Sequence, residues 1–212
     1  MYKRQDPSQR ARGLSIFIVE TGGCAGYRVG PLLDKIGLKA QDTAELFFDD
    51  VRVGADQLLG GEEGRGFAQL MSDLPYERLA VGVIAVGMMQ GALEQTLRHA
   101  RERKVFGKYL IELQNTRFKL AEVATSVKVA RTFVDACIVD LLAGRLDTVT
   151  ASMVKSWASD LQGKVIDECL QLFGGYGYMN EFVIGRMYVD ARIQRIYGGA
   201  NEIMKEVIAR GL

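Results

Sequence analysis

The sequence predicts a mainly α-helical protein, in which a C-terminal antiparallel four-helix-bundle domain follows a partial β-domain. The composition changes near residue 60, where β-rich segments with glycine turns give way to long segments with helical periodicity. Of the three prolines, Pro75 alone lies beyond residue 31, so little interrupts helices in the second part. We therefore expect a partial β-domain over residues 1–60 and a helical domain over residues 61–212.

The first part contains only a few candidate strands. Residues 14–19 form an apolar-rich run that is typical of a buried strand, and residues 43–53 predict one or two more. Gly22-Gly23 and Gly26 indicate turns between them. So few strands would leave unpaired edges, and we do not expect them to form a stable sheet alone.

The second part contains six segments with apolar residues at helical spacing. Pro75 falls in the expected first turn of one of them, where its missing N–H costs little. Gly144 and Gly174-Gly175 indicate helix ends. Because three or four long helices have short links, an antiparallel bundle is favoured. The six segments are residues 65–73, 75–103, 112–144, 147–173, 181–195 and 200–210.

The composition argues against several classes of function. The formal net charge is +1, which gives no support for a nucleic-acid partner or an anionic membrane surface. The best membrane candidate, residues 79–89, is far shorter than the ~20 residues of a membrane span. We expect the single His99 at a helix surface, and no metal site. Cys24, Cys137 and Cys169 show no ligand spacing, and we expect them to be reduced and buried.

Two segments carry candidate chemistry. Glu77 stands where a long helix is expected to begin, and Tyr197 is followed by Gly198 near the C-terminus. Acids are common in the first turn of a helix because the macrodipole favours them there. From the residues alone, this structural explanation of Glu77 is preferred over a chemical one.

Seven motifs follow one another along the chain, at residues 35–46, 50–53, 59–60, 64–67, 103–108, 171–178 and 196–205. In this order they resemble the C-terminal portion of acyl-CoA dehydrogenases. The resemblance covers the end of the family's middle β-domain and all of its helical domain. Neither the N-terminal helical domain nor the β-segment that packs on the flavin ring has a counterpart in this sequence. Ordered motifs spread over residues 35–205 are more specific than any single motif.

The resemblance implies a catalytic base. Short- and medium-chain members carry a Glu after the Tyr of the last motif, whereas long-chain and isovaleryl-type members carry it in a Glu-Arg-Leu element. Here the first position is Gly198 and the second is Glu77, so Glu77 is the expected base. Arg78 and Gly198 are expected at the substrate. Removing hydrogen from Cα and Cβ of an acyl thioester needs a base and a hydride acceptor, and no side chain accepts hydride.

The resemblance also implies FAD as the cofactor. By this resemblance Arg103 meets the pyrophosphate of the FAD in a neighbouring subunit, which suits an arginine because its planar fork matches a pair of phosphate oxygens. Without the resemblance, Arg103 would belong to a basic helix end, Phe106 to the core and Gly174-Gly175 to a helix stop. The expected cofactor contacts are Arg103, Phe106, Gln114, Gln171, Gly175 and Glu202.

One position departs from the family pattern. Most relatives have a Thr where this chain has Ala200, and the Thr hydroxyl bonds to the cofactor. Its loss removes one hydrogen bond, worth about 1 kcal/mol. Asn201 and Glu202 match the long-chain pattern, although an acid at the start of a surface helix explains Glu202 equally well.

The resemblance implies further properties of the whole protein. They are an acyl-CoA substrate, electron-transferring flavoprotein as electron acceptor and a homotetramer. The location would be the cytoplasm in a bacterium or the mitochondrial matrix in a eukaryote. We expect the isolated chain to bind FAD weakly or not at all, and to expose apolar surface. Two alternatives stay open, an acyl-CoA oxidase-like enzyme and a non-catalytic fragment or assembly module.

Overall fold

The computed structural model describes residues 2–4 and 7–212, which form two compact units. The first unit holds Met1–Lys35 and Lys39–Leu74, and the second holds Ile36–Leu38 and Pro75–Leu212. The division therefore falls after Leu74, inside a long helix, whereas the change in composition lies near residue 60.

The first unit contains two separate antiparallel strand pairs in its described residues. The predicted strand at residues 14–19 is confirmed only over Leu14–Ile16, and residues 43–53 supply one strand that ends at Phe48. The strand Tyr27–Leu32 was not predicted, because Gly30 and Pro31 interrupt its apolar pattern. The pairs are β1 (Tyr2–Arg4) with β2 (Leu14–Ile16) and β3 (Tyr27–Leu32) with β4 (Ala44–Phe48), and the 3-10 helices are η1 (Pro7–Gly13) and η2 (Ala55–Gln57).

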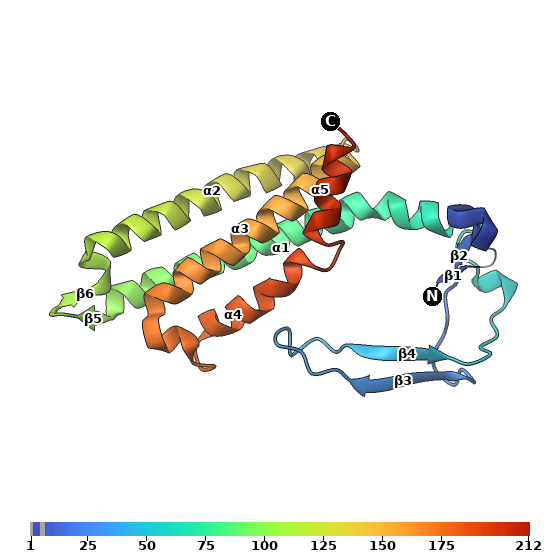
Figure 1. The fold of residues 1–212 in the computed structure, drawn as a ribbon, viewed down its shortest axis with the longest axis horizontal. Helices are drawn as coiled ribbons and strands as arrows, with labels where there is room; N and C mark the ends of the chain where they lie inside the picture. Colours follow the sequence, from blue (N-terminus) through green and yellow to red (C-terminus); the bar gives the residue numbers. More distant parts are fainter. Residues whose placement is uncertain (1, 5–6) are drawn as a thin grey trace. The chain divides into compact units, whose positions relative to one another are not determined.

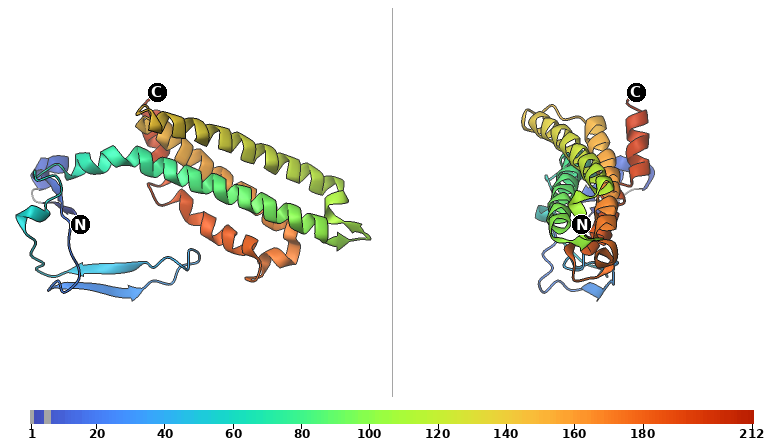
Figure 2. Two further views of the ribbon diagram at one scale, coloured as in Figure 1. Left: turned by 180° about the vertical axis from the view of Figure 1, so that it is seen from behind. Right: turned by 90° about the vertical axis from the view of Figure 1, so that its left-hand side faces the viewer.

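The second unit is an antiparallel helical bundle, which confirms the predicted fold class. Three long helices run side by side in alternating directions, and a shorter fourth helix returns along them (Figures 1 and 2). The helices are α1 (Gly66–Glu102), α2 (Gln114–Leu142), α3 (Thr148–Phe173), α4 (Val183–Ala191) and α5 (Asn201–Ala209). The links contain the hairpin β5 (Lys104–Val105) and β6 (Lys108–Tyr109) and the 3-10 helices η3 (Leu110–Glu112), η4 (Gly174–Tyr178) and η5 (Arg192–Arg195).

Helix α1 differs from the prediction. The two segments expected at residues 65–73 and 75–103 form one continuous helix, with Pro75 inside it. Pro75 cannot donate a hydrogen bond to the carbonyl of Met71. Met71 is exposed, so water can solvate that carbonyl. The expected helix start beside Glu77 was therefore wrong.

Local signals set the start of α3 and the ends of α2 and α3, and of these the glycine stops were predicted. Asp147 caps α3, where its Oδ1 accepts hydrogen bonds from the backbone N–H groups of Val149 (2.7 Å) and Thr150 (2.8 Å). Gly144 and Gly174 have φ of 68° and 58° just beyond α2 and α3, a conformation that side chains disfavour. These ends place the segments that carry the candidate site residues.

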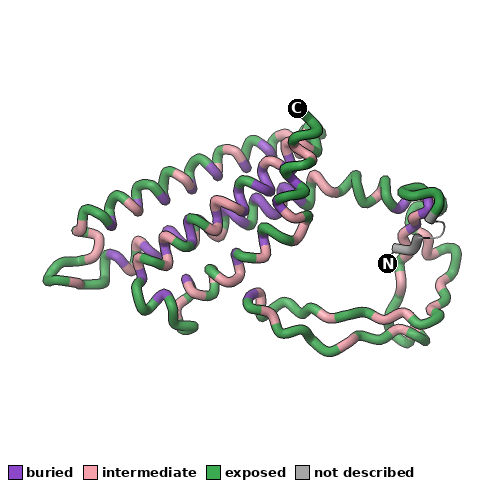
Figure 3. The backbone as a smooth tube through the Cα atoms, in the orientation of Figure 1, coloured by how far each residue is buried: buried purple, intermediate pink, exposed green. Residues whose placement is uncertain are grey.

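The core lies between the helices of the second unit, where the backbone is coloured as buried in Figure 3. Met89, Val134 and Ile166, from three different helices, are fully buried there. By contrast, α2 exposes large apolar side chains, as expected for surface that another chain or domain covers. They include Phe118, Val129, Val139 and Leu142.

The described residues contain no helix long and apolar enough to cross a membrane. They also contain no group of three or more potential metal-binding side chains. All three cysteines are free: Cys137 and Cys169 are buried as predicted, whereas Cys24 is only half-buried. Burial raises the pKa of the two buried thiols, which keeps them protonated.

Candidate functional site

Glu77 and Gly198, which are far apart in the sequence, lie next to each other in the second unit. A Cβ atom built on Gly198 would lie 3.8 Å from Glu77 Oε1 and 3.5 Å from Cγ2 of Val81, one turn further along α1. A glutamate at Gly198 would bring a second carboxylate against Glu77, and like charges so close are unfavourable. The two positions therefore share one space, which suits a single glutamate.

Glu77 is not a helix-start acid. It lies about three turns inside α1, where the partial positive charge of the helix N-terminus no longer acts. Its side chain is exposed, on the part of α1 that faces the Gly198 turn. The residues alone favoured Glu77 as a first-turn acid stabilised by the helix macrodipole, and this explanation does not apply.

Arg78 points in another direction. It is only 5% exposed, and its Nη1 donates a hydrogen bond of 3.0 Å to Ser152 Oγ on α3. Ser152 Oγ in turn donates to the carbonyl of Thr148. Burial lowers the pKa of Arg78, and the neighbouring Glu77 opposes that shift. The role of Arg78 at the substrate stays a prediction.

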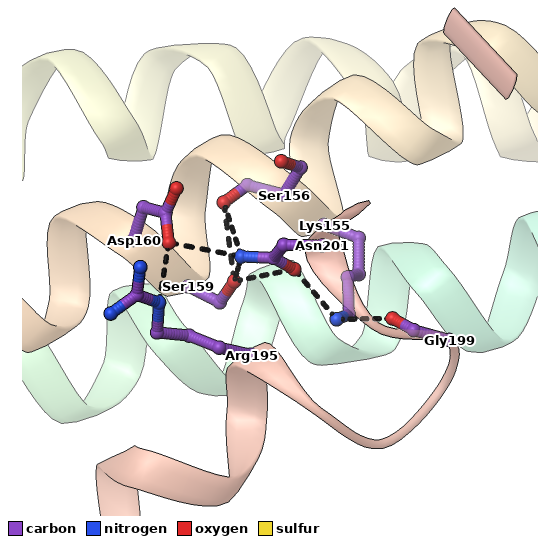
Figure 4. Close-up of polar contacts among 7 residues, drawn as sticks. All are labelled: Lys155, Ser156, Ser159, Asp160, Arg195, Gly199 and Asn201. Carbon is purple, nitrogen blue, oxygen red and sulfur yellow. Dashed lines mark hydrogen bonds and ion pairs between the residues drawn. The ribbon is translucent and has the colours of Figure 1, made fainter. Parts of the chain in front are cut away.

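A buried polar network supports the turn that carries Gly198 (Figure 4). Lys155 Nζ donates to the Gly199 carbonyl (2.6 Å) and to Asn201 Oδ1 (2.8 Å). Asn201 Nδ2 donates to Ser159 Oγ (2.9 Å) and to Asp160 Oδ1 (3.0 Å). Burial lowers the pKa of Lys155 to about 8. The network joins α3 to the first residue of α5.

A second group of predicted residues lines a cavity of about 1150 Å³ at the other end of the bundle. Arg103, Phe106, Gln171 and Gly175 all line it. The Arg103 guanidinium lies over the ring of Tyr176, 5.1 Å from its centroid, and so holds a cation at the cavity wall. An arginine, exposed aromatic rings and glycine backbone are the groups that a dinucleotide needs, and they fit FAD.

Phe106 occupies an unusual position in this cavity. It is 99% exposed at the tip of the β5–β6 hairpin, with φ of 50°, and Gly107 follows with φ of 80°. Both central residues of such a two-residue turn need positive φ, which Gly adopts easily and Phe does not. A bulky apolar residue in a strained, exposed turn favours a contact with a ligand or another chain.

The remaining predicted residues lie outside the cavity. Gln114 begins α2 and is exposed, although its neighbours Leu113 and Asn115 line the cavity. Glu202 is exposed in the first turn of α5, at the opposite end of the bundle from the hairpin (Figure 1). Ala200 precedes α5 and supplies no side-chain cap.

Sequence reasoning missed two residues. His99 was expected on a helix surface, but it stacks on Phe173 with ring centroids 4.2 Å apart and lines the Arg103 cavity. Burial and the Arg103 charge lower the pKa of His99. Lys155 carried no motif at all. An apolar-periodic helix with a lysine on its buried face was the only available signal.

Known proteins are similar to this chain over most of its length. Residues 64–212 match the family model for the acyl-CoA dehydrogenase C-terminal domain. The mitochondrial long-chain specific acyl-CoA dehydrogenase of Rattus norvegicus is 52% identical over 200 residues, which cover 94% of this chain and 46% of that protein. Cyclohexane-1-carbonyl-CoA dehydrogenase of Geobacter metallireducens is 41% identical, over 93% of this chain and 52% of its own length.

Solved structures give the same result. The crystal structure of an acyl-CoA dehydrogenase from Geobacillus kaustophilus matches with a TM-score of 0.95 and 43% identity, covering 99% of this chain and 55% of that one. This chain spans about half the length of the relatives that it matches. With the family model, the sequence relatives and the fold in agreement, the chain belongs to the acyl-CoA dehydrogenase family.

Proposed function

We propose that this protein takes part in the FAD-dependent α,β-dehydrogenation of acyl-CoA thioesters, with Glu77 as the base. The observation that carries the proposal is the 3.8 Å between Glu77 Oε1 and a Cβ built on Gly198. Positions 77 and 198, the two places where the family carries its catalytic base, lie next to each other, and only position 77 holds a carboxylate. Relatives that are named as dehydrogenases of long-chain and cyclic acyl-CoA substrates support the reaction class.

The chemistry divides between the chain and its cofactor. The Glu77 carboxylate accepts the proton from Cα of the thioester, and the electron pair left behind forms the Cα–Cβ double bond. FAD, when bound, supplies the acceptor for the hydride that leaves Cβ. Proton and hydride together are the two hydrogens lost by the substrate. Gly198, without a side chain, leaves the space opposite Glu77 open for an acyl chain.

Arg103, Phe106, Gln171 and Gly175 are the residues that would hold FAD, because they line one cavity with a cation at its wall. Glu77 lies in the first half of α1, whereas Arg103 follows the last residue of that helix, whose length Figure 2 shows. From Glu77 to Glu102, α1 rises roughly 37 Å, at about 1.5 Å per residue. We therefore propose that the cavity of one subunit contacts the FAD that serves Glu77 of another.

This division of the site favours an oligomer, and a homotetramer is our proposal for it. The exposed apolar side chains of α2 supply surface for such contacts. Electron-transferring flavoprotein is the proposed electron acceptor. Reduced protein that is reoxidised by this flavoprotein, and only slowly by air, would support the dehydrogenase. Rapid reoxidation by air would favour an acyl-CoA oxidase-like enzyme instead.

The experiment that tests the proposal moves the carboxylate. In the longest natural polypeptide that carries this sequence, Glu77→Gly is combined with Gly198→Glu, and bleaching of the flavin by acyl-CoA is followed without oxygen. Gly198 has φ of 63°, so a Glu there is strained by about 1–2 kcal/mol and only part of the rate should return.

Glu77→Gly alone is the matched control. We expect the control to bleach at least about 100-fold more slowly than the wild type, and the double variant to recover part of that loss. A double variant that binds flavin and substrate but bleaches no faster than the control would contradict the shared space. A wild-type protein with bound flavin that no acyl-CoA bleaches would contradict the proposed reaction.

A further inference from the structure

Lys155 is a buried cation that the proposed chemistry does not use. Its side chain is fully buried on α3, and its Nζ has no carboxylate within ion-pair distance among the described residues. Neutral oxygen atoms accept its hydrogen bonds instead, from Gly199 and Asn201. A charge in such surroundings is costly, and the lowered pKa of Lys155 reflects that cost. A residue that opposes stability in this way invites a functional explanation.

The turn that Lys155 contacts has little else to hold it. Gly198 and Gly199 have φ of 63° and 95°, a conformation open to glycine but not fixed by it. Within the described part of the chain, the peptide groups of Gly198 and Gly199 make a single hydrogen bond, which the Gly199 carbonyl accepts from Lys155 Nζ. Without it, two flexible residues would join Tyr197 to α5 with no polar anchor.

The second contact of Lys155 fixes the far side of the turn. Asn201 is 3% exposed, and it is tied to α3 through the Ser156 carbonyl, Ser159 and Asp160. Asp160 is in turn paired with Arg195 at 2.6 Å, just before the turn. Hydrogen bonds and an ion pair therefore attach both ends of the turn to the same helix, α3 (Figure 4).

The same lysine lies close to the candidate base. Its Cε is 4.0 Å from a Cβ built on Gly198, and that Cβ is 3.8 Å from Glu77 Oε1. Loosening the turn would therefore alter the wall that faces the carboxylate. The ammonium is not needed for the contact itself, since a neutral amine still has two N–H groups for the two acceptors.

We propose that Lys155 is a positioning residue, which fixes the Gly198–Gly199 turn against Glu77 through the Gly199 carbonyl and the Asn201 side chain. The catalytic consequence rests on the proposed function, whereas the fixing of the turn does not. Misplacing a reacting group by about 1 Å can cost on the order of 100-fold in rate. Lys155 should therefore matter most when the reacting carboxylate stands on the turn itself.

The test uses Lys155→Met, which keeps the apolar stem and removes the hydrogen bonds. It is made in the wild type and in the Glu77→Gly, Gly198→Glu background, with Lys164→Met, at an exposed position of the same helix, as the control. We expect flavin bleaching to slow by at least about 10-fold more in the second background, where the base stands on the turn, than in the wild type. A lysine that served stability alone would slow both backgrounds alike, and that result would overturn the proposal.

A second measurement does not depend on catalysis. The amides of Tyr197, Ile203 and Met204 donate hydrogen bonds at the two ends of the turn, and their hydrogen exchange should speed up about 10-fold or more in Lys155→Met, while the buried middle of α2 keeps its protection. Unchanged exchange at the turn would overturn the proposal, even in a protein that shows no dehydrogenase activity. Should Lys155→Met fail to fold, Asn201→Ala removes the second anchor. Unchanged exchange of the Tyr197, Ile203 and Met204 amides in that variant would overturn the proposal equally.

Discussion

Lys155 should make the folded protein more stable as the pH rises through the alkaline range. Burial lowers the pKa of Lys155 from its ordinary 10.5 to about 8, with Asp160 and Glu202 opposing and Arg78 adding to the shift. Between these pH values the folded protein has released the proton that the unfolded chain still holds. The unfolded state then binds more protons, so the free energy of unfolding increases with pH.

The size of this effect follows from the shift. Each pKa unit is worth about 1.4 kcal/mol, so 2.5 units, from 10.5 to 8, correspond to about 3 kcal/mol. About 2 kcal/mol of this should be gained between about pH 7 and pH 9.5. Other groups titrate over the same range, so the wild type must be compared with a variant that lacks only this amine. Lys155→Met is that variant, because it keeps the volume of a fully buried side chain.

Urea unfolding at several pH values, followed by fluorescence of the single Trp157, measures the difference. Trp157 lies on α3 close to Lys155 and packs edge-on against Phe133, so its emission reports the state of this helix. Between about pH 7 and pH 9.5, the free energy of unfolding should increase by about 2 kcal/mol more in the wild type than in Lys155→Met. Lys164→Met should show the same pH dependence as the wild type. If the free energy of unfolding changes with pH equally in the wild type and in Lys155→Met, the lowered pKa of the buried Lys155 amine is refuted.

Three further outcomes are expected. Asp147→Ala should destabilise the protein by about 1 kcal/mol at neutral pH, measured by urea unfolding, because α3 loses its cap. Hydrogen bonds from Thr150 hold the pKa of Asp147 below its ordinary value, so this difference should shrink as the pH falls through that pKa. Ala200→Thr should tighten FAD binding about 5-fold by equilibrium dialysis, the equivalent of one hydrogen bond of about 1 kcal/mol; unchanged affinity would show that no cofactor group lies there. Arg103→Gln should weaken FAD binding by at least about 10-fold, whereas Arg101→Gln, on an exposed neighbour, should not.

Helical periodicity and glycine stops predicted most of the bundle correctly. Gly144 and Gly174 end α2 and α3 as expected, because positive φ is a local property that a single residue signals. Pro75 misled the prediction, because its cost depends on whether the freed carbonyl meets water, and that is set by tertiary structure. Strand β3 was missed for a similar reason, since its pairing with β4 outweighs the break at Gly30 and Pro31.

The candidate site was predictable where a motif carried it. Glu77 and Gly198 could be paired from the sequence only through the resemblance to a family, and the structure then brought them within reach of each other. Lys155 and His99 were missed because periodicity can place a residue on one face of a helix but does not show which partners it meets there. Their roles depend on partners from other elements, Asn201 for the lysine and Phe173 for the histidine.

The most direct test of the account is Glu77→Gln in the longest natural polypeptide that carries this sequence. Glutamine keeps the size and hydrogen bonding of glutamate but cannot take the α-proton. Flavin content and acyl-CoA binding should persist, while anaerobic flavin bleaching by acyl-CoA should slow by a factor of about 10² or more. Glu94→Gln, at an exposed position of the same helix, should bleach like the wild type. Bleaching of Glu77→Gln at the wild-type rate would contradict the assignment of Glu77 as the base.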